Sequence, residues 1–86
     1  MRKFAKIFDA EPSQILVQKA TNDDGNFGIK LSIEHEDVFV HATISAPGIA
    51  EEKMNEVFDE YSHDKAIEVC NQIFGEALQI KFTKIS

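Results

Sequence analysis

The chain reads FGIKLSIEHEDVFVHATIS from Phe27 to Ser45, and this stretch decides the fold. Apolar residues occupy every second position on both sides of the acidic segment 35–37, namely Phe27, Ile29, Leu31 and Ile33, then Val38, Val40, Ala42 and Ile44. Successive side chains of a strand point to opposite faces, so a period of two predicts strands with one buried and one exposed face. The stretch therefore predicts a β-hairpin in a sheet covered on one side, with a two-residue tip at 35–36 or 36–37.

Two further strands are predicted before this hairpin. Residues 4–8 are apolar on both faces, which is typical of a strand buried between two neighbours. Residues 14–21 form the next strand, and the segment 22–25 fits a hairpin loop with Gly25 in the left-handed conformation. This loop pairs Thr21 with Phe27, Val17 with Leu31 and Ile15 with Ile33, so that apolar residues face one another. The segment 9–13 between the two strands is predicted as a turn.

Helical periodicity begins after Pro47, where the sheet is expected to end. Five apolar residues between 50 and 61 recur at the spacing of one helical face, namely Ala50, Met54, Val57, Phe58 and Tyr61. Ser62 is a candidate N-cap for a second helix, and Gly75 is a candidate left-handed stop at its end. One continuous helix over 50–74 is the alternative, and the gap in the apolar pattern between Tyr61 and Ala66 argues against it.

Alternating Leu78, Ile80 and Phe82 predict a short fifth strand at the edge of the sheet, beside the first strand. The element order is then ββββααβ. We expect an α+β fold in which two C-terminal helices cover one face of a four-stranded antiparallel meander. Because 86 residues are too few to bury two cores, residues 1–86 are expected to form a single domain.

Composition narrows the functional classes. Cys70 is the sole cysteine, so an intramolecular disulfide is excluded and a reducing, cytoplasmic location is expected. No segment approaches the ~18 consecutive apolar residues of a membrane span, so no membrane association is expected. The net charge is −6, and residues 47–76 contain eight acids against two lysines. Such a negative field repels phosphate, so direct nucleic-acid binding is not expected.

Catalytic and metal-binding motifs are missing from the sequence. The histidines His35, His41 and His63 have no zinc-site spacing, and we expect no metal, cofactor or catalytic residue. The segment 22–25 fails as a calcium loop, because Ala20 and Leu31 would take positions that need carboxylates. Cys70 lies on the apolar side of the second helix, as expected of an inert core thiol.

Two surfaces remain as candidate binding sites. The first is an acidic helix face formed by Glu51, Glu52, Glu56, Asp59 and Glu60. It is either an ordinary solvated face or a docking face for a basic partner. The second is the uncovered face of the sheet, where Leu16, Ala20, Phe39 and His41 are expected to form a mixed apolar patch. That patch is either a chance grouping or an interface for a homodimer.

The absence of catalytic motifs and the acidic helix face favour one function. We expect a small, acidic, non-catalytic protein-binding module that acts as an inhibitor or regulator by occupying a basic surface of a protein partner. Nucleic-acid mimicry is one form of such binding. The first alternative is a homo-oligomeric structural or accessory protein that assembles through the outer sheet face. The second alternative is a small enzyme that uses His41 and a nearby carboxylate.

Overall fold

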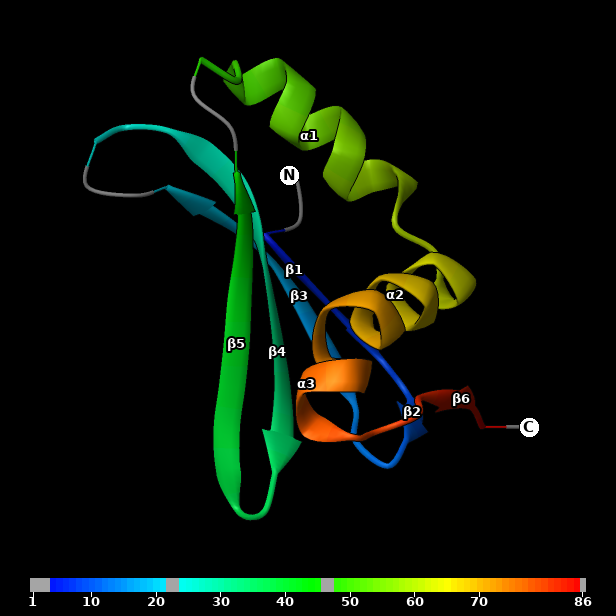
Figure 1. Cartoon of the computed structure of the whole chain (residues 1–86). Helices are drawn as coiled ribbons and strands as arrows, with labels where there is room; N and C mark the ends of the chain where they lie inside the picture. Colours follow the sequence, from blue (N-terminus) through cyan, green and yellow to red (C-terminus); the bar gives the residue numbers. More distant parts are fainter. Residues whose placement is uncertain (1–3, 22–23, 46–47, 86) are drawn as a thin grey trace.

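The computed structural model describes residues 4–21, 24–45 and 48–85. An antiparallel sheet of four strands runs in the order β1-β3-β4-β5, so the strands form a meander. Its strands are β1 (Ala5–Phe8), β3 (Ile15–Thr21), β4 (Phe27–His35) and β5 (Val38–Ser45). Helices α1 (Glu51–Glu60), α2 (His63–Cys70) and α3 (Glu76–Leu78) all lie on one side of it. Figure 1 shows this arrangement, and the predicted α+β fold class is confirmed.

The β4–β5 hairpin forms as its period of two predicts. Glu36 and Asp37 make the two-residue tip with φ angles of 52° and 66°, the left-handed pair that matches the twist of a hairpin. The register sets Ile33 opposite Val40 and Leu31 opposite Ala42. Leu31 is 0 % exposed whereas Phe39 is 73 % exposed, so the predicted inner and outer faces are confirmed.

The β3–β4 pairing also follows the prediction. Thr21 lies opposite Phe27 and Val17 opposite Leu31, and Gly25 has the expected left-handed φ of 81°. The loop residues Asn22 and Asp23, like Pro47 after β5, lie outside the described residues. Strands β4 and β5 approach each other so closely at Gly28 that a Cβ atom there would lie 2.6 Å from the Ile44 carbonyl oxygen. Only glycine fits that position.

The core lies between the sheet and the helices. Ile15, Val17, Leu31 and Ile33 contribute from the sheet, and Phe58, Ala66, Cys70 and Phe74 from the helical side. Ser62 begins α2 as predicted, since its Oγ accepts a hydrogen bond of 3.2 Å from the Lys65 backbone N–H. The helical segment 50–74 is thus broken after α1, in agreement with the two-helix prediction.

The expected stop at Gly75 is wrong. Gly75 has right-handed helical angles, and a π-helical turn, η1 (Asn71–Gly75), continues directly into α3. The left-handed residue is Gln79, with φ 55°, and the Ile80 N–H donates to the Gly75 carbonyl oxygen at 3.0 Å. This six-to-one bond is the closing bond of a Schellman motif, so the helix ends four residues later than the glycine suggested.

The C-terminal segment differs from the predicted edge strand in its length and in its partner. The strand β6 is only Thr83–Lys84, and it pairs with β2 (Ala10–Glu11) in a separate two-stranded sheet. The preceding chain is held to the helices instead, because the Asn71 side chain bonds both backbone groups of Phe82, at 2.7 and 3.2 Å. Because residues 10 and 11 pair with β6, part of the segment 9–13 that was predicted as a turn is the strand β2.

Strand β1 lies at one edge of the sheet and not between two neighbours, as its two-sided apolar character had suggested. Lys6 and Phe8 point to the inner face, opposite Val17 and Ile15, while Ile7 points outward and is 65 % exposed. The physical reason is that the end of helix α1, and not a second strand, packs against the inner face of β1 at Lys6.

Lys6 joins β1 to the C-terminal end of α1. Its ammonium group donates to three backbone carbonyl oxygens, those of Phe58 at 2.7 Å, Tyr61 at 3.3 Å and Asp59 at 3.4 Å. It also lies 4.7 Å from the centre of the Phe58 ring. The last turn of α1 has no basic residue of its own, so Lys6 supplies the positive charge that favours a helix C-terminus.

We predict that Lys6→Met destabilises the protein, because methionine keeps the apolar stem but leaves the three carbonyl groups without their charged donor. Hydrogen bonds to charged groups contribute about 1.5–3 kcal/mol, so a loss of that size is expected in the free energy of unfolding. Urea denaturation followed by circular dichroism measures it. The matched control is Lys81→Met at an exposed position, and equal urea midpoints for the two variants would contradict the prediction.

Candidate functional site

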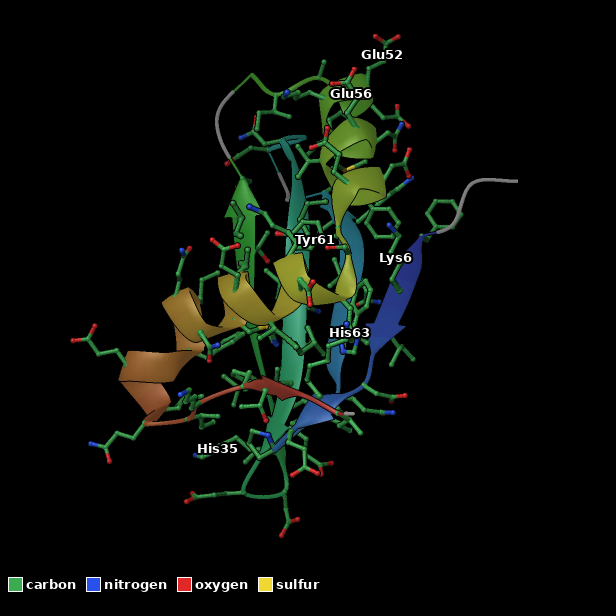
Figure 2. The ribbon with its side chains drawn as sticks, turned by 90° about the vertical axis from the view of Figure 1, so that its right-hand side faces the viewer. Lys6, His35, Glu52, Glu56, Tyr61 and His63 are labelled. Atoms are coloured by element: carbon green, nitrogen blue, oxygen red, sulfur yellow. The ribbon has the colours of Figure 1, made fainter. Side chains whose placement is uncertain are left out.

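Helix α1 displays the acidic surface that the sequence predicts. Five carboxylates along the helix are exposed: Glu51, Glu52, Glu56, Asp59 and Glu60. The last four lie on the side away from Met54 and Phe58, which point into the core, whereas Glu51 lies one turn before Met54. We call the five carboxylates the α1 acidic surface. In Figure 2, Glu52 and Glu56 lie near the N-terminal end of α1, at the far end from the hairpin tip.

The carboxylates do not all share one local environment. Glu52, Glu56 and Asp59 line a shallow hollow of about 230 Å³ together with Asn55. Glu51 faces another hollow, beside Phe4 and Lys19. Within the described part of the chain one ion pair reaches this surface, between the Lys53 ammonium and Glu56 at 3.8 Å. Both partners are mostly exposed, and such a pair neutralises little of the local charge.

The position of Asp59 and Glu60 is electrostatically unfavourable. Both lie in the last turn of α1, where the helix dipole is negative and a carboxylate is destabilising. Lys6 binds carbonyl oxygens of this turn, which partly offsets the accumulated negative charge. Folding alone therefore gives no reason for these two acids, whereas Glu51 and Glu52 in the first turn stabilise the helix.

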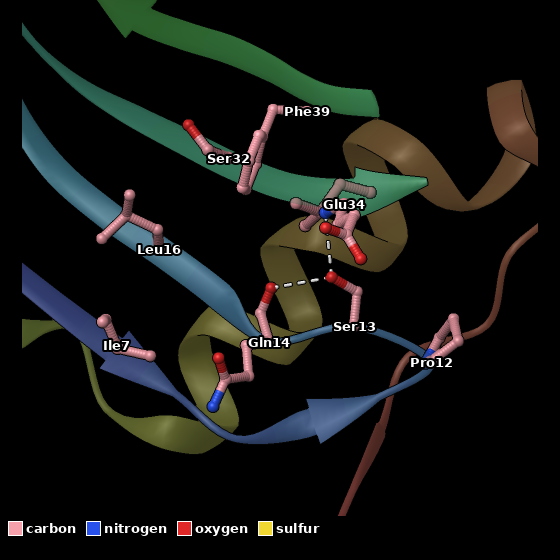
Figure 3. Close-up of a pocket in the computed structure, with 9 residues that line it drawn as sticks. Ile7, Pro12, Ser13, Gln14, Leu16, Ser32, Glu34 and Phe39 are labelled. Atoms are coloured by element: carbon pink, nitrogen blue, oxygen red, sulfur yellow. Dashed lines mark hydrogen bonds between the residues drawn. The ribbon is translucent and has the colours of Figure 1, made fainter. Parts of the chain in front are cut away.

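The second predicted surface lies on the uncovered face of the sheet. Leu16 lies opposite Ser32, and Ser32 lies opposite His41, in a row across four strands that begins at Ile7 on β1. A hollow of about 470 Å³ lies along this row and is lined by Ile7, Ser13, Leu16, Ser32, Glu34 and Phe39, among others. Figure 3 shows these side chains, including Ser13, whose Oγ accepts from the Glu34 N–H and donates to the Gln14 carbonyl.

The four residues of the predicted outer patch are not all brought together. Leu16 and Phe39 line the same hollow, and His41 is exposed at the β5 end of the row that contains Leu16. Ala20 lies opposite Gly28, four residues along β3 from Leu16, and lines the hollow beside Phe4. The patch thus divides into a Leu16–Phe39 part and a separate Ala20.

The histidines occupy three different settings. His63 stacks on Phe8 with ring centroids 5.9 Å apart, and its Nε2 donates to the Asp9 carbonyl oxygen, so it fixes the start of α2 to the sheet. His35 lies 4.0 Å from the Glu36 carboxylate at the hairpin. Among the described residues no carboxylate forms an ion pair with His41, and no group of three or more His, Cys, Asp or Glu side chains could hold a metal ion.

Strand β5 is an edge strand, as expected for the last strand of the predicted meander. Among the described residues its backbone hydrogen bonds go to β4, and its other side is unpaired. Val38 is 60 % exposed and Ile44 is 44 % exposed, although both point to the inner face. An apolar notch of about 110 Å³ lies between Ile44 and α1. The notch depends on how α1 packs against the sheet, so no local pattern in the sequence could have revealed it.

Comparison with known proteins adds no functional information. No protein-family model matches the chain, and neither the curated proteins nor the solved structures contain a match. In the described residues no helix is long and apolar enough to cross a lipid bilayer.

Cys70 is a buried thiol, as predicted, and burial raises its pKa to about 12 from the ordinary 9.0. The folded state therefore holds this proton more tightly than the unfolded state. The resulting stabilisation is complete below about pH 9 and is lost as the pH rises through about 12.

We predict that the wild-type free energy of unfolding, measured relative to Cys70→Ala, falls by about 2 kcal/mol between neutral pH and about pH 10.5. Subtracting the free energy of unfolding of the alanine variant removes the contribution of the other titrating groups, which both proteins share. Urea denaturation of both proteins at the two pH values measures the difference, and a constant difference would contradict the buried, protonated thiol.

Proposed function

We propose that this protein is a non-catalytic binding module that occupies a basic surface of a protein partner with the α1 acidic surface. One observation carries the proposal: four exposed carboxylates, Glu52, Glu56, Asp59 and Glu60, lie on the side of a single helix away from the core, with one ammonium group within 4.0 Å of them among the described residues. Such an arrangement attracts a cationic surface and steers its approach.

The helix is held firmly enough to present these charges as a fixed array. Met54 and Phe58 anchor it in the core at 6 % and 0 % exposure, and Lys6 binds its last turn. A fixed array loses little conformational entropy on binding, which favours affinity. Acids at spacings of four residues also repel one another, and a cationic partner relieves that repulsion.

The position of the carboxylates supports the same function. Asp59 and Glu60 stand at the negative end of the helix dipole, where they reduce the stability of the free protein. A role in binding a partner accounts for them, whereas a purely solvated helix surface does not require them there. A partner that normally grips nucleic acid has such a basic surface, so inhibition by nucleic-acid mimicry is the form of regulation we propose. The lone buried cysteine makes the reducing cytoplasm its proposed location.

We predict that reversal of Glu52, Glu56 and Glu60 to lysine abolishes binding of the partner while the fold is retained. The partner is first obtained by capture on immobilised wild-type protein and mass spectrometry, and is then purified. Titration calorimetry measures its affinity for each variant at low and high salt. Because the contact is driven by charge, wild-type affinity is expected to fall steeply as salt rises.

The matched control reverses three exposed acids at the other end of the molecule, Glu34, Glu36 and Asp37, so that both variants have the same net charge. It should bind like the wild type. Equal affinity of the α1 variant and the wild type, or equal loss in both variants, would refute a specific role for the α1 acidic surface.

A further inference from the structure

The β5 edge differs from the usual protected edges of natural sheets. Exposed edge strands normally carry lysine, other charges or proline that prevent pairing with another chain. Strand β5 runs Val38 to Ser45 without lysine, arginine, aspartate, glutamate or proline. The opposite edge, β1, contains Lys6, whose ammonium group is bound to α1.

We propose that two copies of this chain form a homodimer by antiparallel pairing of their β5 edges, with the two-fold axis at His41. The two sheets would join into one continuous sheet with both helical layers on the same side. This inference is independent of the α1 acidic surface, which it leaves exposed.

The register follows from which residues share a face. Directly opposite residues of antiparallel strands point to the same side of a sheet. With His41 opposite the partner's His41, Val38 meets the partner's Ile44 and Val40 meets the partner's Ala42. Every inner-face pair is then apolar, and the two most exposed inner residues of the strand, Val38 and Ile44, cover each other. On the outer face Phe39 meets the partner's Thr43.

The apolar notch supports this register independently. It is lined by Ile44, Ile29, Met54 and Val57 on the face that α1 covers, beside the point where the partner's Val38 would lie. The partner's side chain can therefore enter an apolar space at each end of the interface.

Because β5 has no charged residue, it favours an uncharged strand, such as the β5 of a second copy, over a charged peptide as the occupant. Each copy has a net charge of −6, so two copies repel through most of their surfaces. The β5 strand itself is uncharged, and antiparallel pairing places the two α1 helices at opposite ends of the joined sheet. The two acidic surfaces are thus kept apart.

Disulfide trapping tests the register directly. Opposite residues of antiparallel strands have Cα atoms about 4.5–5.5 Å apart, within the range that a disulfide spans. Under mild oxidation the variant His41→Cys should form a covalent dimer in high yield, because the native Cys70 is buried. The control Thr43→Cys places its thiols four residues apart along the pair, about 13 Å, and should yield little cross-linked product.

Light scattering on the eluted protein provides the second measurement. The wild type should elute at twice the chain mass of 9.7 kDa, and His41→Gln should behave alike. His41→Lys and His41→Glu should each be monomeric because like charges meet at the axis, and their equimolar mixture should again be dimeric. Circular dichroism verifies that every variant is folded.

Three results would overturn the proposal. The first is a wild-type protein that is monomeric at every concentration tested. The second is a dimer that persists in both His41→Lys and His41→Glu, since it would use another surface. The third is equal cross-linking of the His41→Cys and Thr43→Cys variants, since this would exclude the register.

Discussion

The contact between the Lys6 ammonium group and the end of α1 is the interaction on which the rest of the structure depends. Three donors meet three carbonyl oxygens, at 2.7, 3.3 and 3.4 Å. This contact allows α1 to end over the sheet although its last turn holds Asp59 and Glu60 and no cation. It also fixes the break at Tyr61, after which Ser62 begins α2 in a new direction. A cation in an edge strand thus supports an anionic helix.

The two faces of the sheet then have different roles. The inner face binds the helices and holds the core, while the outer face has no helical cover and carries the hollow between Leu16 and Phe39. The α1 acidic surface points away from both. The uncharged β5 edge is a third, separate surface, so the proposed binding of a basic partner and the proposed self-association would use different parts of the molecule and are compatible.

Sequence reasoning succeeded where the information is local. The period of two and the short loops determine the β4–β5 hairpin, its two-residue tip and the pairing of Val17 with Leu31. The exposed acids Glu52, Glu56, Asp59 and Glu60 of α1 were also predictable, because 3.6-residue periodicity separates them from Met54 and Phe58. Sequence reasoning failed where contacts between distant residues determine the structure. Gly75 continues the helix, Gln79 ends it, and the C-terminal strand pairs with Ala10–Glu11. The role of Lys6 has no local signature in the sequence.

Amide hydrogen exchange of α1 in the Lys6→Met variant tests the central claim most directly. If Lys6 holds the end of this helix, the α1 amides should exchange faster than in the wild type, while the amides of α2 and of β4 keep their protection. The acidic surface would then lose its fixed geometry without global unfolding. Unchanged exchange in α1, or equal acceleration throughout the chain, would contradict the claim that this one ammonium group positions the helix.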